Sequence, residues 1–187
     1  MRVVRKLLAL PILGLCLILV GAGTAGATPS KYDSHAGDGF GGIESPDVAS
    51  APDGATITIQ STGAFHVTSG KASSTLGTFV HRAADGSPVG SGSFAITGLR
   101  SFASFGCGVA GGQTIPSNLC GGHAEFSVHV IGHPAAGGTE EFDAVFTVTC
   151  VVGDHVPPGT EEGVTFDVPG LISFDHPVSG ETVFVLK

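Results

Sequence analysis

Apolar and polar residues alternate along most of the chain that follows Gly54. The run 123–131 shows the pattern most clearly, because Phe126, Val128 and Val130 fall on one face. Similar runs occupy residues 55–60, 64–68, 75–82, 91–99, 141–150, 163–168, 171–175 and 181–186. A period of two is typical of a β-strand with one buried face, and no helical apolar stripe of useful length follows Gly54. We therefore predict an all-β, single antiparallel domain of about 8–9 strands over residues 54–187, either a β-barrel or a two-sheet β-sandwich.

One part of the run 91–99 carries a resemblance. Gly92-Ser93-Phe94-Ala95-Ile96-Thr97-Gly98 resembles the Ser-Phe-Ala-Ile-Thr-Gly run of allene oxide cyclase-like barrels. The resemblance covers seven residues of 187, and Leu99-Arg100-Ser101-Phe102 stand where that family has a glycine-rich stretch. It implies an antiparallel barrel around an apolar cavity.

The N-terminal segment has the three parts of an export signal. Arg2, Arg5 and Lys6 precede an apolar run over residues 7–20, and the small-x-small sequence Ala25-Gly26-Ala27 follows. We predict that residues 1–27 are a signal peptide, removed on secretion, which leaves an extracellular protein without a membrane anchor. Residues 28–53 are rich in Gly, Pro, Ser, Asp and Ala, and we predict that they form a flexible lead before the domain.

The charge balance restricts the class of partner. The chain has 8 Lys+Arg and 16 Asp+Glu, a formal net charge of −8. Three of the basic residues lie within the predicted signal, so the remaining chain carries five basic and 16 acidic residues, a net charge of −11. No basic cluster occurs after Lys6, and such a surface disfavours nucleic acids and anionic membranes.

Three cysteines remain after the predicted signal, namely Cys107, Cys120 and Cys150. In an exported protein an odd number indicates one disulfide and one free thiol. A Cys107–Cys120 disulfide would close the glycine-rich loop between the two residues. If residues 123–131 and 141–150 form a hairpin, Cys150 lies opposite residues 122–124, which favours Cys120–Cys150 as the alternative. A pairing of Cys107 with Cys150 is the third possibility.

Two arrangements of side chains could carry chemistry. Cys120-Gly-Gly-His123 has a spacing that suits zinc, and Cys107 and Cys150 could complete a Cys₃His site as an alternative to the disulfide. His123, Glu125 and His129 share the polar face of one predicted strand. If that face lines a barrel cavity, the three side chains are candidate acid–base catalysts; if it faces water, they are surface residues.

Sequence motifs for nucleophilic catalysis or cofactor binding are missing. The chain has no Gly-x-Ser-x-Gly elbow, and its two Gly-x-Gly-x-x-Gly strings do not fall between a strand and a helix. We predict a secreted, non-catalytic binding or structural module without a cofactor. The alternative is a small barrel carrier, or a cyclase- or isomerase-like enzyme, that takes a small hydrophobic ligand into an internal cavity.

Overall fold

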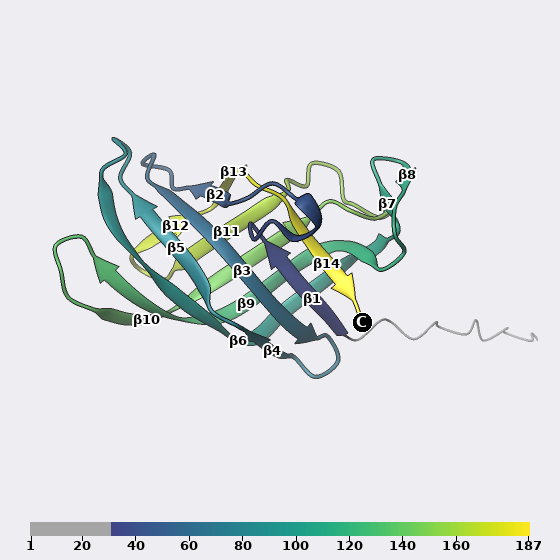
Figure 1. Ribbon diagram of the computed structural model, residues 1–187, viewed down its shortest axis with the longest axis horizontal. Helices are drawn as coiled ribbons and strands as arrows, with labels where there is room; N and C mark the ends of the chain where they lie inside the picture. Colours follow the sequence, from purple (N-terminus) through teal and green to yellow (C-terminus); the bar gives the residue numbers. More distant parts are fainter. Residues whose placement is uncertain (1–30) are drawn as a thin grey trace, which may run out of the picture.

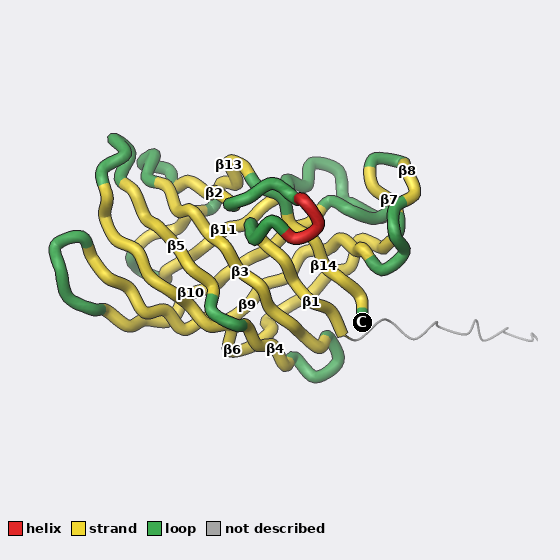
Figure 2. Tube along the Cα trace, viewed as in Figure 1, coloured by secondary structure: helices red, strands yellow, loops and turns green. Residues whose placement is uncertain are grey.

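The computed structural model describes residues 31–187, so the predicted signal peptide lies outside the described residues. The described chain is almost entirely β-structure, as predicted (Figure 1). A short 3-10 helix, η1, joins the first two strands, and loops gather at the ends of the strands (Figure 2). The elements are β1 (Lys31–Ala36), η1 (Phe40–Gly42), β2 (Asp47–Ser50), β3 (Thr56–His66), β4 (Lys71–Ser74), β5 (Gly77–Arg82), β6 (Pro88–Cys107), β7 (Val109–Ala110), β8 (Gln113–Thr114), β9 (Leu119–Pro134), β10 (Glu140–Cys150), β11 (Gly163–Val168), β12 (Ile172–Phe174), β13 (His176–Ser179) and β14 (Thr182–Leu186).

The strands of the large antiparallel sheet form a closed circuit of hydrogen-bonded neighbours. Strand β3 pairs with β1 and β5, β5 pairs with β6, β6 with β9, β9 with β14, and β14 with β1. The sheet therefore closes on itself in a barrel-like fold. Strands β10, β11 and β12 extend the sheet from β9, and β2 and β13 extend it from β3.

The predicted runs occur as strands, several of them longer than their alternation indicated. Residues 163–168 coincide with β11, and the β9–β10 hairpin places Cys150 opposite Gly122, within the predicted range. Strand β6 continues to Cys107 and β9 begins at Leu119. These extensions are rich in Gly, Ser and Ala, which give no hydrophobic alternation but pair through the backbone.

The prediction of a flexible lead over residues 28–53 is wrong for the described part of that range. Strand β1 pairs along both edges, with β14 and β3, and β2 pairs with β3 and β13. Tyr32, Ser34 and Ala36 alternate inward and are buried. Backbone pairing on both edges and small buried side chains hold this segment, although its composition is low in apolar residues.

The end of the barrel at which β3 finishes is filled with aromatic rings. Phe65 packs against Tyr32, Phe102, Phe126 and Phe184, with centroids 5.0–5.6 Å apart. We call these five residues the base cluster. Tyr32, Phe65, Phe126 and Phe184 are at most 1% exposed. Edge-to-face and stacked contacts at such distances add to the hydrophobic gain of burial, so the base is a well-packed core.

Candidate ligand pocket at the barrel mouth

The opposite end of the barrel holds an apolar pocket of about 400 Å³. The β5–β6 and β9–β10 loops project at this end, at the left in Figure 1, and residues next to both loops line the pocket. We call this end the mouth and the hollow the mouth pocket. Its apolar side chains come from β3, β5, β6, β9 and β10 and from the β11–β12 hairpin; they are Ile57, Phe79, Val89, Pro134, Phe142, Phe166, Val168, Leu171, Ile172 and Phe174.

Glycines occupy inward positions of β6 and β9 at the mouth, and Gly90 and Gly132 line the pocket. Gly92 in β6 lies directly opposite Gly132 in β9, and the next inward pair towards the base is Phe94 with Val130, both buried. At the level of the glycine pair, the two long strands therefore send no side chain inward. The ring of Phe79 fills the space beside Gly92, where an added Cβ would lie 2.8 Å from that ring.

His81 is the polar side chain that enters the pocket. It lies on β5, two residues after Phe79, and is partly buried. Its imidazole packs edge-on against the Phe174 ring, with centroids 5.0 Å apart. Burial lowers the pKa of His81, and the negative charge of Asp53 opposes this effect. The ring is therefore neutral at pH 7, with one nitrogen that donates and one that accepts.

The other polar side chains of the pocket stand at its rim. Ser91, His133 and Glu140 line it but are exposed. The Nδ1 atom of His133 lies 3.3 Å from Thr139 Oγ1, within the β9–β10 loop region. The pocket thus combines an apolar interior, a single inner imidazole and a polar entrance.

The predicted row of His123, Glu125 and His129 lies elsewhere. Alternation along β9 sends Phe126 and Val128 into the core, and the row faces outward. None of the three lines the mouth pocket. The prediction that the row could line a cavity is wrong, because the apolar face of β9, rather than its polar face, points inward.

Each member of the row has a partner on a neighbouring strand. His123 Nδ1 lies 2.9 Å from Thr149 Oγ1, and Ser101 Oγ donates to Glu125 Oε2 at 3.2 Å. His129 is exposed and lies 3.1 Å from Asp143, whose hydrogen bond raises the pKa of His129. These contacts join β9 to the strands on either side of it.

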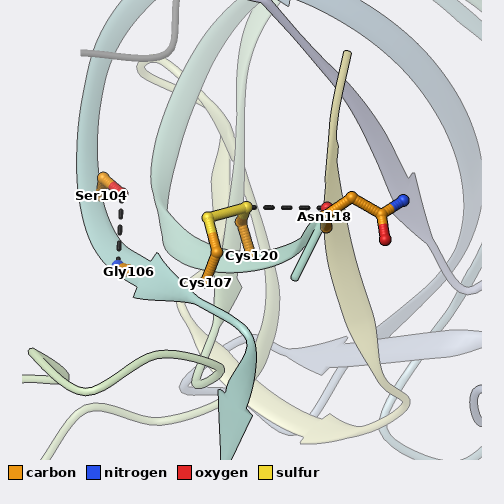
Figure 3. The surroundings of a disulfide bond; sticks show 5 residues. All are labelled: Ser104, Gly106, Cys107, Asn118 and Cys120. Atoms are coloured by element: carbon orange, nitrogen blue, oxygen red, sulfur yellow. Dashed lines mark hydrogen bonds between the residues drawn. A yellow bond between two sulfur atoms is a disulfide. The ribbon is translucent and has the colours of Figure 1, made fainter. Parts of the chain in front are cut away.

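The first of the three predicted cysteine pairings is the one that forms. Cys107 and Cys120 are cross-strand partners in β6 and β9 and form a disulfide (Figure 3). Cys150 is a free, buried thiol, and burial raises its pKa to about 12. The alternative pairings through Cys150 are therefore wrong. The zinc alternative with Cys107, Cys120, His123 and Cys150 is wrong as well, because the disulfide occupies two of its four ligands.

A buried carboxylate, Asp47, and a partly buried one, Glu162, lie outside the mouth pocket. Glu162 accepts hydrogen bonds from the backbone N–H groups of Val151 and Thr182, at 2.9 and 3.0 Å. Asp47 is fully buried, and neither of its carboxylate oxygens has a hydrogen-bond partner. Burial, followed by the charges of Glu162 and of other acidic residues nearby, raises the pKa of Asp47 to about 8. We call Asp47 and Glu162 the acid seam.

The acid seam has no arrangement that suits a metal. Within residues 31–187, no group of three or more His, Cys, Asp or Glu side chains is placed to hold an ion. The same part of the chain contains no helix that is long and apolar enough to cross a membrane.

Comparisons with protein-family models, with curated proteins and with solved structures give no match for this chain. The candidate site therefore rests on its own geometry.

Sequence reasoning missed the mouth pocket, although one signal was present. Gly90 and Gly92 continue the inward phase of Phe94 in β6, and Gly132 continues the inward phase of Val130 in β9. Two neighbouring strands that replace inward residues by glycine at the same end indicate a hollow there. His81 gave no such signal, because its inward direction depends on the position of β5 in the barrel.

Proposed function

We propose that this chain is an exported, non-catalytic binding protein that holds a small, mainly apolar molecule in the mouth pocket. One observation carries the proposal: a hollow of about 400 Å³ at one open end of a barrel, with apolar side chains around it. Small-molecule sites in proteins have volumes of about 300–1,000 Å³ and are mostly apolar, with few polar groups. Mouths of β-barrels are common positions for them.

Binding is favoured over catalysis by the distribution of titratable groups in the pocket. Of the titratable side chains that line the pocket, His81 is partly buried, whereas His133 and Glu140 lie at the exposed rim. Acid–base catalysis generally requires a proton donor and a proton acceptor positioned around one substrate. A pocket with one inner imidazole is better suited to orienting a ligand.

Export is supported by two features of the chain. The N-terminal sequence has the pattern of a cleaved signal, and the Cys107–Cys120 disulfide is compatible with an oxidising compartment.

A neutral fluorescent probe tests the binding function. N-phenyl-1-naphthylamine should bind the protein at a ratio of one to one, with a rise in fluorescence as it leaves water. Gly132→Val should weaken the binding about tenfold or more, which corresponds to about 1.4 kcal/mol. A Cβ at Gly132 would make ordinary contacts with Phe142 and Phe79, so the larger side chain enters the pocket without a backbone clash.

Gly98→Val provides the matched control. Gly98 lies in β6, the neighbour of β9, and outside the pocket, and a Cβ there meets nothing within 4 Å. This variant should bind the probe as the unaltered protein does. The proposal fails if the unaltered protein does not bind the probe, or if the two valine variants bind it equally well.

A further inference from the structure

We propose that the ligand of the mouth pocket is a neutral, mainly apolar molecule that carries one hydroxyl group, and that His81 exchanges a hydrogen bond with that hydroxyl. This inference rests on the proposed binding function and specifies the class of ligand.

The surroundings of His81 give it an unmet hydrogen-bonding capacity. It lies between Ile57, its partner in β3, and Gly90, its partner in β6, neither of which has a polar side chain. Phe174 offers the ring an aromatic contact. Within residues 31–187, His81 has no hydrogen bond from a neighbouring side chain that affects its protonation. Because His81 lines the pocket, its ring nitrogens can form a hydrogen bond with a ligand that enters there.

A hydroxyl group suits a neutral imidazole better than an ion does. One nitrogen of the ring can accept the hydroxyl proton, or the other can donate to the hydroxyl oxygen. A carboxylate would meet the negative charges of Asp53 and Glu140 near the pocket, on a chain whose net charge is −8. An ammonium group would be attracted by these charges, but inside the pocket it would exchange its hydration for one neutral acceptor.

Three probes of nearly equal shape compare an apolar, a hydroxyl-bearing and an anionic ligand: naphthalene, 2-naphthol and 2-naphthoate. Their affinities are measured by displacement of bound N-phenyl-1-naphthylamine at pH 7.5. The unaltered protein should bind 2-naphthol about three- to tenfold more tightly than naphthalene, the range expected for one neutral hydrogen bond. It should bind 2-naphthoate more weakly than 2-naphthol.

His81→Phe and His133→Phe form a matched pair of variants. The first keeps an aromatic ring beside Phe174 and removes the nitrogens; the second makes the same change at the exposed rim. His81→Phe should abolish the preference for 2-naphthol and keep naphthalene binding. His133→Phe should keep the preference, because His133 already lies beside Thr139.

The outcomes distinguish this inference from the binding function. Equal affinity for naphthalene and 2-naphthol, or tightest binding of 2-naphthoate, overturns the hydroxyl proposal while the pocket stands. A preference for 2-naphthol that persists in His81→Phe overturns the role of His81. Failure of the unaltered protein to bind even the fluorescent probe overturns the binding function itself.

Discussion

The mouth and the base of the barrel are built from the same kinds of residue and differ in how they fill the space between strands. At the base, Phe65 touches four other rings, and hardly any of its surface remains exposed. At the mouth, Phe79, Phe142, Phe166 and Phe174 surround a hollow of about 400 Å³. Aromatic content alone therefore does not determine whether a barrel end is solid.

The mouth and the base differ in the residues of β6 that face their aromatic rings. Phe102 of β6 faces inward at the base, whereas Gly92 of the same strand faces inward at the mouth. The Cys107–Cys120 disulfide also ties β6 to β9 beyond the base cluster. The base is thus built for stability and the mouth for an open volume, and each of the following changes tests that division.

The largest expected effect is that of truncating the central ring of the base. Phe65→Ala should lower the free energy of unfolding by about 3–5 kcal/mol, because it leaves a cavity among packed rings. Phe79→Ala at the mouth should cost less than about 2 kcal/mol, because it enlarges an existing hollow. Urea unfolding of both variants measures the difference. Equal costs would show that the mouth is packed as tightly as the base.

Removal of the disulfide should have the next largest effect. The double variant Cys107→Ser/Cys120→Ser should lose about 2–4 kcal/mol of stability, since the bond closes a loop with a sequence separation of 13. Probe binding at the mouth should persist at temperatures at which the variant is folded. A loss of binding in the folded variant would mean that the two ends are coupled.

The acid seam should make stability depend on pH. The pKa of Asp47 is about 8 in the folded chain, above the ordinary value of 3.8, so the folded state holds this proton more tightly than the unfolded state does. The contribution of Asp47 to stability therefore falls as the pH rises from about 4 to about 8.

Asp47→Asn should remove this pH-dependent loss of stability. The stability of the variant relative to the unaltered protein should therefore rise steadily between pH 5 and pH 8. Urea unfolding at several pH values measures the relative stability. A flat profile for Asp47→Asn would contradict the raised pKa. Asp47 pairs with Ile59, between Ile57 at the mouth and Phe65 at the base, so the pocket should bind the probe unchanged.

Alanine substitutions at Gly92 and Gly132 should have the smallest effects on stability. Gly132→Ala should raise the stability by about 0.5 kcal/mol, because its Cβ has room and glycine is unfavourable within a strand. Gly92→Ala should be destabilising, because its Cβ would lie 2.1 Å from the carbonyl oxygen of Ile131. Thermal unfolding of the two variants should therefore shift in opposite directions. A stabilised Gly92→Ala would contradict the close approach of β6 and β9.

Sequence patterns predicted the strands whose burial follows hydrophobic alternation. The run 123–131 and the register of Cys150 with Gly122 are examples. The sequence patterns missed β1, in which the inward residues are one Tyr and small residues. This strand pairs on both edges with strands that are distant in sequence, and such pairing leaves no local signal. The candidate site was missed for a related reason: the positions of His81 and the glycine pair depend on which strands become neighbours.

Chemical-shift mapping with 2-naphthol tests the central claim, that the mouth is open to a ligand and the base is not. In ¹⁵N-labelled protein, saturable shifts should appear at the backbone amides of Ser91, Gly132 and His133, around the mouth pocket. The amides of Phe65 and Cys120, at the base, should stay unchanged. Shifts centred on the base, or no saturable shifts at the mouth, would contradict the account.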